Sequence, residues 1–220
     1  MNATVAVLAA VGGGVAALGW PPLEPLLVRR SEDAVEQPAW TRRITARPIV
    51  AGASALACGA VGLRFGATRE LVPALMLAFA LVGLTAIDFR YRILPNRITY
   101  PLALAGVVLG AALRFSELPE LGLAAFGAGG FLLVAALLSP SGLGMGDVKL
   151  AFVLGLFLGS SVVVAIVAGL VSSSVPALIM LLVHGRGARK MHLALGPFLA
   201  LGGMLALLAG DDVISWYTGG

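Results

Sequence analysis

The sequence predicts an all-α membrane protein, a polytopic bundle of about eight transmembrane helices. Hydrophobic residues make up 59% of the 220-residue chain and charged residues only 12%, whereas soluble domains carry about a quarter charged residues. The apolar residues gather in long stretches, and the charged residues lie mostly in the loops between them. Because a chain in lipid must satisfy its own backbone, such stretches are expected to be helices.

The apolar stretches define the expected spans in chain order. They are 3–20, 48–66, 71–87, 100–113, 121–138, 150–160, 162–183 and 193–209. The first stretch lacks the basic residues that precede the apolar part of a signal peptide, so we expect a retained helix. A span needs about 20 residues, and the stretches 100–113 and 150–160 must therefore extend into their flanks.

The loops predict two units and one orientation. We expect an N-terminal transmembrane hairpin over 1–70, with a short cytoplasmic loop at 21–47, and a membrane core over 71–220. With the N-terminus outside, all Lys and Arg residues except three fall in cytoplasmic loops, as the positive-inside rule requires. The basic residues thus flank helices next to the lipid bilayer, and no patch for nucleic acid is indicated.

The cysteine content excludes two kinds of site. Cys58 is the single cysteine of the chain and lies inside an apolar stretch. The sequence therefore offers no disulfide framework and no pair of cysteines to hold zinc. We expect neither a metal nor a cofactor.

Two aspartates lie where a cytoplasmic loop meets the membrane. Asp88 is in "TAIDFRYRILPNRITYP" and Asp147 is in "SGLGMGDVKLAF". Carboxylates at this depth are costly and commonly functional. The structural alternatives are that Asp147 caps the helix opened by "VKLAF" and that Asp88 pairs with Arg90 or Arg92. Lys149 is interpreted as an interfacial anchor.

Glycine and proline flank the second aspartate and open the last span. Gly144 and Gly146, with Gly142 before them, permit positive φ and are expected to allow close approach of an extended substrate; the alternative is an ordinary flexible loop. Gly196 and Pro197 are expected to kink the last span and open room for a substrate helix; the alternative is an ordinary membrane proline.

These three segments resemble a known family when taken together. Asp88 followed by "FRYRILPN", the "GMGD" at Asp147, and "GPFLALGG" in the last span resemble the three signatures of type IV prepilin peptidases, which are GxGD-type membrane aspartic proteases. They occur in the family's order. The chain resembles a short form of the family that lacks its cysteine-rich N-terminal region.

The resemblance implies a function and a site. Family members act in the bacterial inner (plasma) membrane, where they remove the basic leader of prepilin or pseudopilin-like proteins. They cut at the cytoplasmic face, after a glycine and before a transmembrane helix. Asp88 and Asp147 correspond to the catalytic aspartates. The resemblance assigns substrate-binding or loop-shaping roles to Pro95, Asn96, Gly144, Gly146, Gly196 and Pro197.

The chemistry of such a site needs only the two carboxylates and water. One carboxylate accepts a proton from the water, and the other donates a proton to the substrate. A helix N-terminus favours Asp147 as the base, but Arg90 and Arg92 oppose a protonated Asp88, so the assignment stays open. Many family members also methylate the new N-terminus. We expect protease activity alone, because paired cysteines are missing.

Two other classes of function stay open at this stage. The first is a small proton- or cation-coupled transporter, since short helices interrupted by glycine often line transport sites. The second is a non-catalytic assembly subunit that keeps the aspartates as structural caps. Substitution of either aspartate separates these hypotheses from a peptidase.

Overall fold

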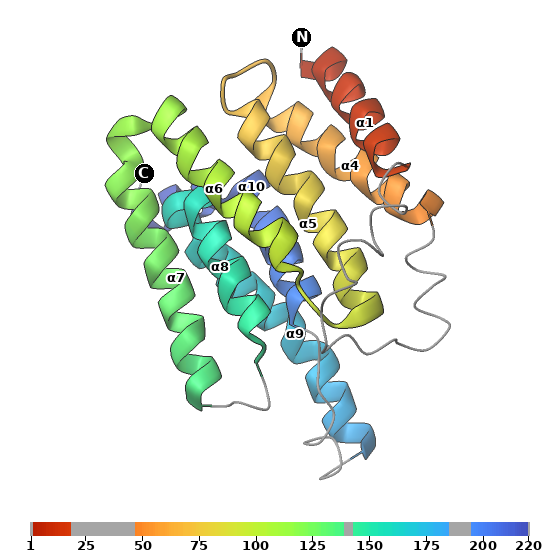
Figure 1. Ribbon diagram of the computed structural model, residues 1–220, viewed down its shortest axis with the longest axis vertical. Helices are drawn as coiled ribbons and strands as arrows, with labels where there is room; N and C mark the ends of the chain where they lie inside the picture. Colours follow the sequence, from red (N-terminus) through yellow and green to blue (C-terminus); the bar gives the residue numbers. More distant parts are fainter. Residues whose placement is uncertain (1, 19–46, 139–142, 185–194, 220) are drawn as a thin grey trace.

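The computed structural model describes residues 2–18, 47–138, 143–184 and 195–219, and this part of the chain is almost entirely helical (Figure 1). Its α-helices are α1 (Asn2–Leu18), α4 (Arg47–Phe65), α5 (Leu71–Tyr91), α6 (Asn96–Leu113), α7 (Leu118–Leu138), α8 (Met145–Leu158), α9 (Val162–His184) and α10 (Gly196–Thr218). Two 3₁₀ turns join them, η1 (Phe115–Glu117) and η2 (Gly159–Ser161). Residues 21–46 of the predicted loop and Gly142 lie outside the described residues.

The predicted all-α polytopic bundle is confirmed. Among the described residues, six helical stretches are long and apolar enough to cross a membrane, and α1 is a shorter apolar helix. Helices α8 and α9 belong to one such stretch, Met145–Val183. As expected, the two short stretches extend into their flanks, since α6 begins at Asn96 and α8 begins at Met145.

Helix α8 occupies the centre of the bundle. It has 14 residues, and nine of them are buried. At 1.5 Å per residue it is about 21 Å long, less than the roughly 30 Å of a hydrocarbon core. It packs against α6, α7 and α10. Its first turn lies beside the last turn of α5 and the first residue of α10.

Glycines set the close crossings of this bundle. A Cβ on Gly155 of α8 would collide with the backbone of Ala125 in α7, and a Cβ on Gly202 of α10 would collide with the Ala165 carbonyl of α9. Without a hydrophobic driving force in lipid, helices associate through such close packing. The first contact joins α7 to α8, and the second joins α9 to α10.

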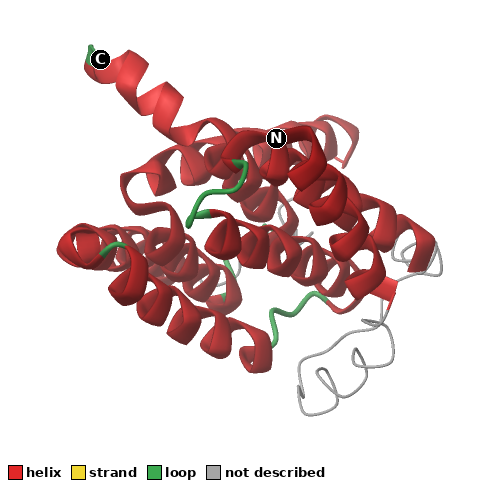
Figure 2. Ribbon diagram, turned by 90° about the horizontal axis from the view of Figure 1, so that it is seen from above, coloured by secondary structure: helices red, strands yellow, loops and turns green. Residues whose placement is uncertain are grey.

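The N-terminal hairpin packs on the side of α5. Helices α1 and α4 lie against one another, and α4 contacts α5. Figure 1 shows them as successive layers beside the remaining helices. At the other end of the chain, the last turns of α10 project from the bundle (Figure 2), where Trp216 and Tyr217 are exposed.

Candidate active site

Asp88, Asp147 and Gly196 each lie on the buried stripe of their helix. Residues three, four and seven apart share one face of an α-helix. The buried stripes run through Leu77, Leu81, Leu84 and Asp88 in α5; Asp147, Leu150, Ala151 and Leu154 in α8; and Gly196, Leu199, Ala200 and Gly203 in α10. The aspartates are therefore buried because they continue core-facing rows.

The three stripes face one another along their length. A Cβ built on Gly203 would lie 2.6 Å from Leu154 Cδ2 and 3.3 Å from Leu81 Cδ1. One heptad away on each helix, the same three elements meet again at Gly196, Asp147 and Asp88. We call this end of the bundle the dyad end.

The two carboxylates converge on Gly196. A Cβ built there would lie 2.6 Å from Asp88 Oδ2 and 3.5 Å from Asp147 Oδ1. The separation of these two oxygens is therefore at most the sum of these distances. The side chains are only 6% and 8% exposed. Two aspartates that lie 59 positions apart in the sequence thus share one small buried space.

Asp147 divides its two oxygens between two environments. Its Oδ2 accepts the backbone N–H of Gly144 at 3.3 Å, while its Oδ1 faces Gly196. The helix begins at Met145 rather than at "VKLAF", and Asp147 lies in its first turn. A capping role and a role in the carboxylate pair are therefore compatible, because each uses a different oxygen.

Asp88 lies in the last turn of α5. Its backbone carbonyl accepts the N–H of Arg92 at 2.9 Å, and Arg92 ends the helix in a left-handed conformation with φ 52°. Asp88 itself is buried, with 6% of its surface exposed. Its Oδ2 faces the backbone at Gly196.

Gly144 and Gly146 do not use the positive φ that their residue type permits. Gly144 has φ −83° and Gly146 lies inside α8; among described residues, positive φ at glycine occurs at Gly66, Gly159 and Gly219. The early start of α8 at Met145 makes Gly146 helical. Close approach is nevertheless required, since a Cβ on Gly146 would lie 2.9 Å from Leu94 Cβ.

Pro95 and Asn96 connect the first motif to the second. Pro95 precedes the first turn of α6, and its carbonyl accepts the N–H groups of Ile98 and Thr99 at 3.0 and 3.1 Å. Asn96 Oδ1 accepts a hydrogen bond from Lys149 Nζ at 2.8 Å. The loop after Asp88 is therefore tied to the helix that carries Asp147.

Lys149 is the residue whose part in this arrangement the sequence analysis missed. Besides its bond to Asn96, its ammonium lies 5.2 Å from the centre of the Tyr100 ring, within the range of a cation–π interaction. The signal available in the sequence was its position two residues after Asp147. That spacing places it on the opposite side of α8.

The predicted kink at Gly196 and Pro197 is wrong. Helix α10 begins at Gly196, so Pro197 lies in the first turn. Proline is tolerated there because the first N–H groups of a helix have no intrahelical partner. Gly196 matters for a different reason, which is the space that it leaves for Asp88.

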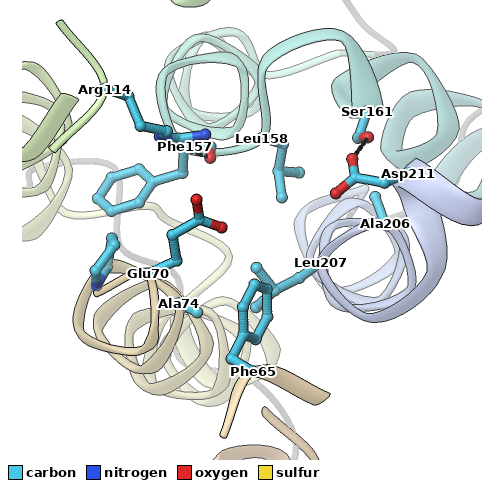
Figure 3. A pocket seen from close by; sticks show the side chains of 11 residues that line it. Phe65, Glu70, Ala74, Arg114, Phe157, Leu158, Ser161, Ala206, Leu207 and Asp211 are labelled. Carbon is cyan, nitrogen blue, oxygen red and sulfur yellow. Dashed lines mark hydrogen bonds between the residues drawn. The ribbon is translucent and has the colours of Figure 1, made fainter. Parts of the chain in front are cut away.

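A second polar group lies at the opposite end of the bundle. Glu70, Arg114, Ser161 and Asp211 line a cavity of about 70 Å³ between α5, α8 and α10 (Figure 3). Ser161 Oγ donates to Asp211 Oδ1 at 2.5 Å, and Arg114 Nη2 donates to the Phe157 carbonyl at 2.9 Å. The first bond fastens η2 to α10, and the second fastens the end of α6 to α8.

The fold and the site together define a polytopic helical membrane protein with a buried pair of carboxylates. Among the described residues, no group of three or more His, Cys, Asp or Glu side chains could hold a metal ion. The chain belongs to the type IV leader peptidase family, whose family model matches residues 75–214.

Named relatives support this membership. The chain is 35% identical to a prepilin leader peptidase/N-methyltransferase of Bacillus subtilis (strain 168) over 163 residues, which cover 72% of this chain and 64% of that protein. It is 32% identical to the protein of the same name from Aeromonas hydrophila, with coverage of 79% and 62%. The protein of that name from Pseudomonas aeruginosa is 31% identical, with coverage of 77% and 60%.

The matched region spans less than two thirds of the length of each of these relatives. No solved structure matches the chain significantly.

Proposed function

We propose that this chain is a membrane-embedded aspartic endopeptidase that removes the leader peptide of prepilin-like proteins. The observation that carries the proposal is the convergence of Asp88 and Asp147 on Gly196. Family membership supports the reaction class, and relatives named prepilin leader peptidases support the substrate class. Prepilin or pseudopilin-like proteins with a transmembrane helix after the leader are the proposed substrates.

The proposed reaction needs no cofactor. One carboxylate is ionised and takes a proton from a water molecule, whose oxygen attacks the carbonyl carbon of the scissile bond. The other is protonated and donates its proton to the carbonyl oxygen. The tetrahedral intermediate then collapses as the C–N bond breaks. The first carboxylate gives the leaving amine the proton that it took from water, and a hydroxyl of the intermediate returns a proton to the second carboxylate. Each turnover consumes one water and returns the pair to its single shared proton.

Asp147 is the proposed base. It lies in the first turn of α8, where backbone N–H groups stabilise an anion, and the Gly144 N–H already donates to it. Asp88 lies in the last turn of α5, where the backbone favours a neutral carboxyl group. In this assignment Asp88 holds the shared proton at the start of the cycle.

The dyad end is proposed to face the cytoplasm of a bacterium, with the chain in the inner membrane and its N-terminus outside. The support is the distribution of basic residues between the ends of the described helices. The dyad end carries Arg90, Arg92, Arg97 and Lys149, and the opposite end carries Arg64, Arg69 and Arg114. We further propose that 71–220 forms the peptidase core and 1–70 the N-terminal hairpin, which agrees with the family match over 75–214.

Co-expression with a prepilin-like substrate tests the proposal. Asp88→Asn and Asp147→Asn each keep the shape of the side chain but remove its ability to exchange a proton. We expect each variant to accumulate in the membrane at the normal level and to leave the substrate uncleaved. Asp212→Asn is the control, because Asp212 is an exposed carboxylate at the opposite end, paired with Arg64 at 3.2 Å. Full cleavage by either dyad variant contradicts the proposal.

A further inference from the structure

An apolar cleft opens at the dyad end between α6 and α7. The two helices are joined at η1 and separate toward their other ends (Figure 1), with α8 as the floor between them. The cleft has a volume of about 360 Å³. Its lining includes Tyr100, Ala103, Gly130, Leu133, Lys149 and Phe152.

From this geometry we infer that the cleft is the docking site for the transmembrane helix of the substrate. The inference rests on the proposed peptidase function, since that function requires a substrate whose cleaved bond leads into an apolar helix. Such a helix must stay in the membrane while the residues before it reach the carboxylates. The cleft is an apolar hollow on the helix that carries Asp147, and it ends beside that helix's first turn.

The walls of the cleft suit another helix. A Cβ built on Gly130 would meet nothing within 4 Å, so the backbone of α7 is open to close approach there, as in other helix contacts within lipid. Opposite it lies Ala103 of α6, another small residue. Phe126 and Phe152 pack edge to face at 5.2 Å and form a firm wall between them. The substrate helix would pack between α6 and α7 as an additional helix of the bundle.

Lys149 supplies the polar end of the cleft. Its ammonium has three N–H donors, of which one goes to Asn96. The substrate backbone must leave its helix near this level in order to reach the carboxylates, and non-helical backbone at membrane depth needs hydrogen-bond partners. Lys149 can donate to carbonyl oxygens of that extended segment.

The distance from the cleft to the carboxylates is short. Asp147 and Lys149 lie on opposite sides of α8, and a helix with its side chains is about 10 Å across. An extended chain covers about 3.3 Å per residue, so about three residues bridge the first turn. The extended segment of the substrate would pass over Gly144 and Met145, both of which are exposed.

A second apolar hollow serves as the comparison. It lies between α7 and α9, has a volume of about 450 Å³, and includes Gly127, Val163, Glu120 and Ser160 in its lining. Glu120 and Ser160 place it toward the end of the bundle opposite the carboxylates. It is larger, but a helix seated there would not lead its N-terminal end to Asp147.

Site-directed disulfide formation tests the inference. Two substitutions are introduced into the chain for this test. Cys58→Ala removes its single cysteine, and Asp147→Asn is expected to prevent turnover. The probe is a prepilin-like protein with a short basic leader, a glycine and an apolar helix, with one cysteine scanned through the first three turns of that helix. Gly130→Cys is expected to form a disulfide with the probe in membranes.

Gly127→Cys is the matched control. It lies on the same helix, and its added Cβ likewise meets nothing within 4 Å, but it faces the second hollow. We expect little disulfide from this position. Equal yields from both positions, a larger yield from Gly127→Cys, or no disulfide at Gly130→Cys would each overturn the docking site; in the last case lipid chains occupy the cleft.

Kinetics give an independent readout that separates the two proposals. Gly130→Leu fills the cleft and is expected to raise KM for the probe by about tenfold with little change in kcat, whereas Gly127→Leu leaves both unchanged. Normal kinetics in Gly130→Leu would reject docking while leaving the peptidase proposal intact. Failure of the unmodified chain to cleave the probe would instead reject the peptidase and, with it, this inference.

Discussion

Leu94 and Gly146 lie against each other so closely that a Cβ on Gly146 would fall 2.9 Å from Leu94 Cβ. This contact joins the loop that follows Asp88 to the turn that carries Asp147. The hydrogen bond between Lys149 and Asn96 reinforces the same junction. The relative position of the carboxylates therefore depends on contacts made outside the pair itself.

Gly146→Ala is expected to impair leader cleavage by separating these two segments. Overpacking of a close contact costs about 1–3 kcal/mol, and here the shift falls on the first turn of α8. Processing of a co-expressed substrate and membrane abundance are the measurements. Gly122→Ala is the control, because its Cβ meets nothing within 4 Å. Equal activity of both variants would show that the contact does not position the site.

Gly196→Ala is expected to lower the turnover number by about tenfold or more. Its Cβ would lie 2.6 Å from Asp88 Oδ2, so the carboxylate must rotate away, and small misplacements of catalytic groups can cost about 100-fold in rate. Initial rates on a purified substrate in detergent, with circular dichroism to check folding, measure the effect. Gly52→Ala is the control, since its Cβ meets open space. An unchanged turnover number would contradict the proposed geometry.

Lys149→Met and Asn96→Ala are expected to be coupled. Each removes the same 2.8 Å hydrogen bond, so the double variant should lose less activity than the two single losses combined. A bond to a charged group contributes about 1.5–3 kcal/mol, and exposure of the pair reduces this value. Logarithms of kcat/KM in a double-mutant cycle give the coupling. Strict additivity would mean that the bond does not hold the loop.

Ser161→Ala is expected to lower stability without loss of cleavage. Ser161 is 2% exposed and donates to Asp211 at the end of the bundle away from the carboxylates. A hydrogen bond to a charged group contributes about 1.5–3 kcal/mol, and the exposure of Asp211 to solvent reduces this value. Thermal unfolding in detergent should show a lower midpoint. A loss of cleavage at temperatures where the variant is folded would mean that this cluster takes part in the reaction.

The product of this chain expressed alone is expected to carry an unmethylated N-terminus. The resemblance associates methyl transfer with paired cysteines, whereas this sequence has Cys58 alone. Mass spectrometry of the mature substrate distinguishes the two products by the mass of one methyl group. Detection of the methylated product, with a vector-only culture as the control, would contradict the expectation.

The helices and the residues of the pair could be predicted from sequence because both depend on local pattern. The lengths of the apolar stretches predicted the spans. Asp88 and Asp147 stood out because each lies where a loop meets an apolar stretch. The buried rows could also have been found, since Leu81, Leu84 and Asp88 follow the helical spacing. That spacing predicts which face a residue occupies.

The errors arose where tertiary contacts decide the outcome. Gly146 was expected in a loop and Pro197 at a kink, but α8 and α10 begin earlier or later than the apolar pattern suggested, and both residues became ordinary members of a first turn. Element boundaries are the least reliable part of such a prediction. The pairing of Lys149 with Asn96 joins positions that are far apart in sequence, and a single sequence carries no signal of such a contact.

The burial of the carboxylate pair restricts what can precede the bond that is cut. Asp88 and Asp147 are only 6% and 8% exposed and lie where α5, α8 and α10 meet. We expect only an extended segment of a substrate to fit between helices packed this closely. A compact domain fused close to the cut site would be held at the surface, and we expect short leaders to be processed while bulky ones escape.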